Sequence, residues 1–201
     1  MTGESNISPN NETFLDNEEF KLNILLKYIR SATLEKRLRA MDELKDIISS
    51  KESYGIFYPN QSRDWENESK NYVVTNEKIK NLIINNNLID YILCDNFHVE
   101  VLKRAKPILA FLAKNKALSK NYLNILWKLS LDVNEHNKTA VFETIIEVSK
   151  YLEKENLDYL YAKINSIPLE KFDEVTIELY KEFVIQSGKS KSPEGFCEKY
   201  I

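Results

Sequence analysis

Apolar residues recur along most of this chain at intervals of three and four positions, the spacing of one face of an α-helix. The pattern predicts helices that begin near residues 16, 33, 75, 97, 119, 136, 154 and 173. Thr75 and Ser119 suit the position before a helix, because a hydroxyl oxygen can accept a hydrogen bond from a first-turn N–H. With four glycines and five prolines among 201 residues, the chain is poor in turn-forming residues. These features predict an all-α protein.

The predicted helices differ in how much of their surface is apolar. The expected core faces of the first two consist of Phe20, Ile24, Leu25 and Tyr28, and of Leu34, Leu38, Met41, Leu44 and Ile48. The opposite side of the second helix carries charges of both signs, which is typical of a face in contact with water. The helix after Ser119 is apolar nearly all round, so we expect neighbours on both sides of it.

Residues 50–74 interrupt the helical spacing. Gly55, Pro59 and Asn60 punctuate this stretch, and its aromatic residues follow no period. We expect a long irregular insertion that lies against the folded part, because aromatic side chains gain by burial.

The two ends of the chain differ in composition from the part between them. Residues 1–15 are rich in Asn, Ser and Glu and predict a disordered segment. The last helix is expected to stop at Gly188, so that 188–201 form a linker. The helical domain is thus predicted to span 16–187, and we expect the chain to be part of a longer protein.

The helix predicted over 97–119 contains Pro107, which cannot donate a backbone hydrogen bond. Projected at about 100° per residue, its apolar side chains gather on one side. They are Phe97, Val101, Leu102, Ala105, Ile108, Leu109 and Leu112. Pro107 falls on the opposite side with Ala110, so the carbonyl of Lys103 that it leaves unpaired is expected to face water. We therefore expect a bend within the helix and no boundary.

Two segments of the chain resemble each other at an offset of 34 residues. Leu118 falls on Leu152, Leu123 on Leu157, Leu126 on Leu160 and Trp127 on Tyr161. Two helices in about 34 residues are the unit of a helical solenoid, in which each repeat buries its apolar face against the next. The small-residue pattern of tetratricopeptide repeats is missing. We therefore predict an all-α, right-handed helical-repeat solenoid of the armadillo or HEAT type, with about eight helices.

Composition and charge narrow the classes of function. The net charge of −3 and the pI near 5.6 argue against a dedicated nucleic-acid surface. No apolar run approaches the roughly 18 residues of a membrane span, and the polar start lacks an apolar signal segment. Two cysteines are too few for a disulfide framework and are typical of a reducing compartment. We expect a cytoplasmic or nuclear protein that binds neither nucleic acid nor membrane.

His98-Val99-Glu100 is the first candidate for chemistry, since it places an imidazole near a carboxylate. A zinc deaminase would also need Pro-Cys-x-x-Cys, and a zincin would need His-Glu-x-x-His on one helix. The sequence contains neither motif. His98 falls on the packed side of the first helical turn, so we interpret it as a buried or capping histidine. A hydrolase that uses His98 and Glu100 stays an alternative.

A thiol–imidazole pair is the second candidate. Glu135 and His136 open a predicted helix, where a carboxylate is favoured by the positive helix end. A protease pair would have to use Cys94, which lies on an apolar turn, or Cys197, which lies in the predicted tail. Neither context supplies the electropositive environment that activates a catalytic thiol.

Basic clusters occur at Lys36-Arg37-Arg39 and at Lys103-Arg104-Lys106. Acidic residues on the next turn dilute both, so we interpret them as solvated helix faces and not as phosphate sites. A glycine-rich phosphate loop is missing from the sequence. The sequence therefore assigns no catalytic, cofactor-binding or metal-ligating residue, and no residue that binds a partner.

Two stretches carry a family resemblance, "ATLEKRLRAMDELKDIIS" and "FHVEVLKRAKPILAFLAKNKALSKNYLNILWK". The motifs concerned are Asn87-Leu88, His98-Val99-Glu100-x-x-Lys103-Arg104, Phe111-Leu112, Leu118-Ser119, Ile125-x-Trp127, Glu135-His136 and Leu157-Asp158-x-Leu160. In order and spacing they resemble, from about residue 32 to 183, the non-catalytic helical region of very large ubiquitin-specific proteases of the fat-facets type. The resemblance implies an armadillo-like scaffold whose cysteine-protease domain lies elsewhere in the parent protein.

In that family a Gly-Asn-x-Cys box and a distant His box mark the catalytic domain, and this sequence contains neither. The resemblance thus implies a non-catalytic scaffold and protein-interaction region of a large ubiquitin carboxyl-terminal hydrolase. It implies a protein partner, either a substrate or another region of the parent protein, and no cofactor. A stand-alone helical-repeat adaptor without protease activity is the main alternative.

Overall fold

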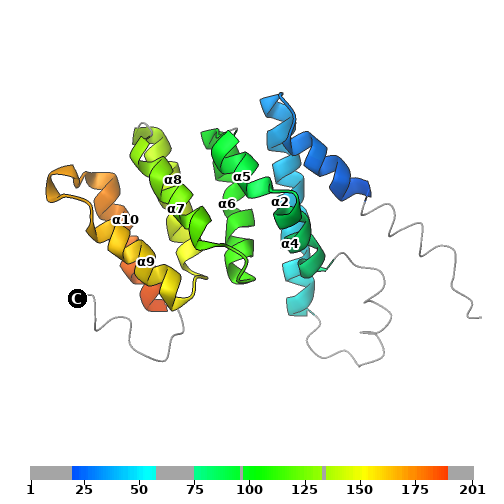
Figure 1. The fold of residues 1–201 in the computed structure, drawn as a ribbon. Helices are drawn as coiled ribbons and strands as arrows, with labels where there is room; N and C mark the ends of the chain where they lie inside the picture. Colours follow the sequence, from blue (N-terminus) through cyan, green and yellow to red (C-terminus); the bar gives the residue numbers. More distant parts are fainter. Residues whose placement is uncertain (1–19, 58–74, 96, 133–134, 190–201) are drawn as a thin grey trace, which may run out of the picture. The chain divides into compact units, whose positions relative to one another are not determined.

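A computed structural model of the chain describes residues 20–57, 75–95, 97–132 and 135–189, and all regular structure in these ranges is helical (Figure 1). The helices span residues 20–29, Leu34–Phe57 (α2), Asn76–Asn85 (α4), Leu88–Asp90 (α5), Val99–Lys114 (α6), Lys120–Asp132 (α7), Glu135–Ser149 (α8), Lys154–Asn165 (α9) and Glu174–Lys189 (α10). A π-helical turn at Tyr91–Asp95 (η1) and a 3-10 turn at Leu169–Lys171 (η2) complete the described elements. The all-α prediction is confirmed.

The chain divides into two compact units, Met1–Asn86 and Asn87–Ile201. In the first unit, helix 20–29, α2 and α4 each bury an apolar side. The buried residues are Leu22, Leu25, Leu26, Ile29, Ala40, Met41, Leu44, Ile48, Ile79 and Ile83. Arg30 also donates a hydrogen bond to the carbonyl oxygen of Asn86, which links the end of the first helix to the end of α4.

In the second unit, α8 packs against α6, α7 and α10, while α7 also contacts α9 and η1. The rings of Trp127 on α7 and Phe142 on α8 stack with centroids 6.3 Å apart. α7 is therefore enclosed on several sides, as its nearly continuous apolar surface predicts.

The predicted repeat is visible in the contacts of the second unit. All six leucines that the 34-residue offset matches are buried, at most 5% exposed. Side chains 32 to 37 residues apart also meet repeatedly between neighbouring segments of the second unit. These pairs are Asp90–Tyr122, Asn124–Tyr159, Lys106–Glu143, Lys116–Glu153, Lys120–Glu155 and Lys138–Asp173. Contacts that recur at the repeat length are what stacked helix pairs produce.

Several predicted helix ends are confirmed in atomic detail. Thr75 caps α4, since its hydroxyl oxygen accepts from the N–H of Lys78 at 3.2 Å. Ser119 accepts in the same way from Tyr122 at the start of α7. Helix α6 continues through Pro107 to Lys114, so the proline is not a helix boundary.

Two predicted helix ends differ in the structure. α2 runs on to Phe57, so the irregular insertion does not begin at residue 50, and the rest of it, 58–74, lies outside the described residues. α10 passes Gly188 and ends at Lys189. The segments 1–15 and 190–201 also lie outside the described part of the chain.

A third difference concerns the side of α6 that was expected to face water. Ala110 is buried, as are its neighbours Phe111 and Ala113. α6 packs against both α8 and η1, so its last turns are enclosed on more than one side. Pro107, on the same predicted outer side, is half-buried.

Asp173 joins α8 to the start of α10, and its charge is expected to make stability depend on pH. Lys138 lies 2.5 Å from its carboxylate, and this hydrogen bond chiefly lowers the pKa of Asp173 from 3.8 to about 2. A carboxyl group whose pKa is lower in the folded than in the unfolded state stabilises the fold at any pH above its unfolded-state pKa. This stabilisation is lost as the pH falls from about 4 to about 2. Because the side chain of Asp173 is 44% exposed and solvent screens its charge, we expect it to contribute only about 1 kcal/mol to the free energy of unfolding.

Asp173→Asn tests this expectation, since asparagine can still cap α10 by accepting from the N–H of Thr176. Urea denaturation near neutral pH should show the variant about 1 kcal/mol less stable than the unchanged chain, and the difference should vanish near pH 2. A difference that persists unchanged at low pH would contradict an origin in the carboxylate charge.

Candidate functional site

His98 is a helix cap in the structure. It precedes α6, and its Nδ1 accepts a hydrogen bond from the backbone N–H of Glu100 at 3.1 Å. Its side chain is half-buried. The capping interpretation is confirmed, and it follows from the free N–H groups at a helix start.

Glu100 is held by cations of its own helix. Its carboxylate lies 2.8 Å from Lys103 Nζ and 3.4 Å from Arg104. The hydrogen bond from Lys103 is the main cause that lowers the pKa of Glu100. A carboxylate with a lowered pKa is a weak general base, so this geometry does not favour the hydrolase alternative built on His98 and Glu100.

Cys94 lies exposed on the π-helical turn η1, four residues before His98, and forms no disulfide. The other residues considered for a thiol–imidazole pair, the side chain of His136 and the whole of Cys197, lie outside what the structure describes. Within the described residues, no group of three or more His, Cys, Asp or Glu side chains could hold a metal ion. Across the same ranges, no helix is long and apolar enough to cross a membrane.

The two basic clusters behave differently. Lys103 and Arg104 pair with Glu100, and Lys106 lies 3.3 Å from Glu143, so acidic neighbours offset this cluster as predicted. Lys36 and Arg39 are exposed, and neither forms an ion pair or hydrogen bond with another described residue. Asp42 and Glu43 do follow the first cluster on the next turn, as predicted, but neither forms an ion pair with Lys36 or Arg39 among the described residues.

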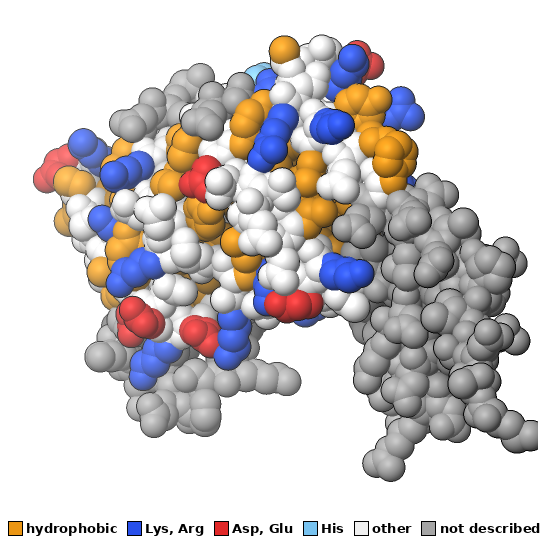
Figure 2. Space-filling view, turned by 45° about the vertical axis from the view of Figure 1, so that its right-hand side comes forward, with side chains coloured by type: hydrophobic (Ala, Val, Ile, Leu, Met, Phe, Trp, Pro, Cys, Tyr) orange, Lys and Arg blue, Asp and Glu red, His pale blue; other side chains and the backbone are white. Residues whose placement is uncertain are grey.

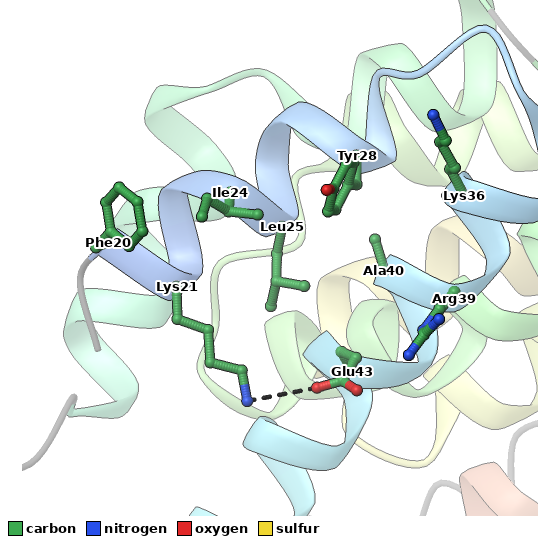
Figure 3. A pocket seen from close by; sticks show the side chains of 9 residues that line it. All are labelled: Phe20, Lys21, Ile24, Leu25, Tyr28, Lys36, Arg39, Ala40 and Glu43. Carbon is green, nitrogen blue, oxygen red and sulfur yellow. Dashed lines mark ion pairs between the residues drawn. The ribbon is translucent and has the colours of Figure 1, made fainter. Parts of the chain in front are cut away.

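Lys36 and Arg39 stand at the edge of a pocket of about 620 Å³ within the first unit (Figure 3). We name it the N-terminal groove. It is lined by Phe20, Lys21, Ile24, Leu25 and Tyr28 from helix 20–29 and by Lys36, Arg39, Ala40 and Glu43 from α2. Figure 3 shows both helices contributing side chains to one space. Figure 2 shows hydrophobic side chains exposed among Lys, Arg, Asp and Glu side chains on the face turned to the viewer.

The aromatic side chains of the groove are unexpectedly open to water. Phe20 is 63% and Tyr28 is 50% exposed, although the sequence predicts both on the core face. Leu22, Leu25, Leu26 and Ile29 form the buried side of the same helix. The prediction of the first core face is thus correct for Leu25 and wrong for Phe20 and Tyr28.

Charge in the N-terminal groove is unbalanced. Three cations and one carboxylate line it, and the carboxylate of Glu43 is 3.4 Å from Lys21 Nζ. Lys36 and Arg39 consequently leave an uncompensated positive edge beside an apolar floor. A surface of this kind is suited to hold another macromolecule, since apolar patches with a polar rim mark interaction sites.

The folded chain is therefore an all-α helical-repeat protein whose most distinctive described surface is a groove. The sequence model of the family described as "UBP24/USP9X/USP9Y ARM repeat" matches residues 16–172, and the chain belongs to this family. The predicted resemblance and the armadillo class of repeat are both confirmed.

Individual relatives agree with this family. Ubiquitin carboxyl-terminal hydrolase 9Y of Mus musculus is 25% identical over 158 residues, which are 78% of this chain and 6% of that protein. Ubiquitin carboxyl-terminal hydrolase 34 of Homo sapiens is 25% identical over 58% of this chain and 3% of its own length. The probable ubiquitin carboxyl-terminal hydrolase FAF of Drosophila melanogaster is 20% identical over a stretch that covers 78% of this chain and 6% of that protein. This chain spans only a small part of the relatives that it matches.

Proposed function

We propose that this chain is a non-catalytic scaffold and protein-interaction region of a large ubiquitin carboxyl-terminal hydrolase whose cysteine-protease domain lies outside it. The observation that carries the proposal is the family match, which covers 16–172 and so falls on the helical repeats. The relatives are ubiquitin hydrolases, and each matches over a few per cent of its length. We infer that the catalytic domain of such a protein lies in the parts that this chain does not match.

The chemistry of the described residues supports the same proposal. His98 is engaged as a cap, and Glu100 is paired with cations of its own helix. The ordered contacts between repeats would hold a surface in a fixed shape, which a scaffold needs in order to bind without a large ordering cost. We infer that the bound partner is a protein, either a substrate or another region of the parent, and that binding takes place in the cytoplasm or nucleus, as the scarcity of cysteine suggests.

The test compares the full-length protein with a form from which 16–172 are excised. If the repeats are a scaffold, the shortened protein should turn over a ubiquitin–fluorophore conjugate within about twofold of the full-length rate, because this substrate needs only the catalytic domain. Removal of ubiquitin chains from a protein substrate should slow at least about tenfold, because the repeats no longer hold that substrate at a high effective concentration near the catalytic domain. The isolated chain should release no fluorophore.

Three results would contradict the proposal. An equal loss of turnover on both substrates would mean that the repeats stabilise the catalytic domain and do not recruit a protein substrate. Release of fluorophore by the isolated chain that disappears in Cys94→Ala or Cys197→Ala would make the chain itself an enzyme. A full-length reading frame without a cysteine-protease domain would favour the stand-alone adaptor.

A further inference from the structure

We propose that the N-terminal groove binds an acidic amphipathic segment of a protein partner, one that carries apolar side chains beside carboxylates. The inference rests on the proposed scaffold function and names the chemistry of the partner. An amphipathic segment laid in an apolar groove is a common mode of peptide recognition, with side chains as anchors and charges at the edges.

The apolar part of the inference follows from exposure. Phe20 and Tyr28 are 63% and 50% exposed, and they lie two helical turns apart on one side of helix 20–29. Ile24 stands between them and is half-buried, while Leu25 and Ala40 close the floor. This row of apolar groups offers anchoring positions for apolar side chains of a bound segment.

The acidic part of the inference follows from charge. Lys36 and Arg39 border the same space without a partner among the described residues, and Glu43 is already offset by Lys21. Residues 20–50 hold seven Lys or Arg against four Asp or Glu, whereas the whole chain holds 28 against 31. The groove therefore lies in a locally positive part of a negatively charged chain, and it complements a segment with carboxylates.

A peptide fits this surface better than a nucleic acid does. Nucleic-acid binding draws mainly on many phosphate contacts, and the groove offers only three cations, one of them paired. Its floor is apolar, which would leave a phosphate backbone poorly solvated. Charge steering of a carboxylate-bearing peptide needs only a few cations at the rim.

The binding experiment uses the full chain and a fluorescein-labelled helical peptide with leucine and phenylalanine on one face and glutamate on the other. Fluorescence anisotropy should show saturable binding that weakens several-fold when salt rises from about 0.05 to about 0.3 M, because screening lengths shorten. A matched peptide with glutamine at each glutamate should bind at least about tenfold more weakly. Equal affinities of the two peptides would overturn the acidic part of the proposal.

Variants locate the binding. Lys36→Glu combined with Arg39→Glu should weaken binding at least about tenfold. The matched control is Lys128→Glu with Lys171→Glu, which changes the net charge equally at two exposed lysines of the second unit and should stay within about twofold. Equal losses in both double variants would show a general charge effect and overturn the site.

A second pair of variants tests the apolar anchors. Tyr28→Ser should weaken peptide binding about tenfold and leave the thermal unfolding midpoint nearly unchanged, since the side chain is half exposed. Leu169→Ser, at an 81% exposed position outside the groove, is the control and should bind normally. An oligonucleotide of equal charge that displaces the peptide at the same concentration would overturn the proposal in favour of a general polyanion surface.

The outcome is separable from that of the proposed function. Suppose that excision of 16–172 slows turnover of the protein substrate but not of the ubiquitin–fluorophore conjugate, and that the peptide does not bind. The scaffold role would then stand, and the groove would be rejected as its docking site. Peptide binding that survives while excision reduces both turnovers equally would keep the groove and reject the recruiting role.

Discussion

Leu126→Ala and Leu160→Ala are each expected to lower the free energy of unfolding of the second unit by about 2–5 kcal/mol. Both leucines are 0% exposed, and they occupy matching positions of two repeats, on α7 and α9. Deleting a buried isobutyl group removes its transfer free energy and leaves a cavity. Since the repeats place the two side chains in similar surroundings, the two losses should agree within about 1 kcal/mol, as urea denaturation followed by circular dichroism can measure.

The matched control for this pair is Leu169→Ala. Leu169 is 81% exposed, so its truncation should change the free energy of unfolding by less than about 0.5 kcal/mol. A loss at Leu160 as small as the control would contradict a continuous core that passes from α7 to α9. A double variant whose loss equals the sum of the single losses would show that the two repeats contribute independently.

Helix starts were the most predictable feature of this fold, because they depend on local chemistry. A hydroxyl or imidazole placed before an apolar-periodic run meets unpaired N–H groups whatever the tertiary fold, as Thr75, Ser119 and His98 show. The repeat was predictable for a related reason. Stacked units bury equivalent positions, so the 34-residue offset that relates Leu126 to Leu160 reappears in the burial of both.

The orientation of the first helix was not predictable from spacing alone. Two apolar stripes run along this helix, one with Phe20 and Tyr28 and the other with Leu22 and Leu26. Leu25 lies between them, since it is buried and also lines the floor of the groove. Both stripes satisfy a helical period, so only the packing neighbours decide which one is buried. The sequence signal for the groove is this surplus of apolar positions beside Lys36 and Arg39.

The burial of Ala110 and the extension of α2 have similar causes. A single helix period cannot show that α6 has neighbours on more than one side, since alanine is compatible with either a buried or an exposed face. Gly55 in the sequence favours a break, yet α2 continues to Phe57. A glycine costs a helix only about 1 kcal/mol, which the rest of a long helix can offset.

Pro107→Ala is expected to raise the free energy of unfolding of the second unit by about 2 kcal/mol. Proline is about 3 kcal/mol less favourable than alanine inside a helix, because it removes one backbone hydrogen bond and crowds the carbonyl four residues before it, here that of Lys103. Up to about 1 kcal/mol of this gain is lost again, since alanine gives the unfolded chain more freedom. Pro107 lies within the 16-residue helix α6, so the argument applies directly.

Pro107→Gly separates the two causes, because glycine restores the N–H donor but retains a poor helix propensity. It should gain about 1 kcal/mol less than Pro107→Ala. Urea denaturation of the three proteins under one condition measures both differences. If Pro107→Ala instead loses stability, the proline must hold a bend that the packing of α6 on α8 requires, and its half-buried ring would then contribute more through contacts than it costs through the missing hydrogen bond.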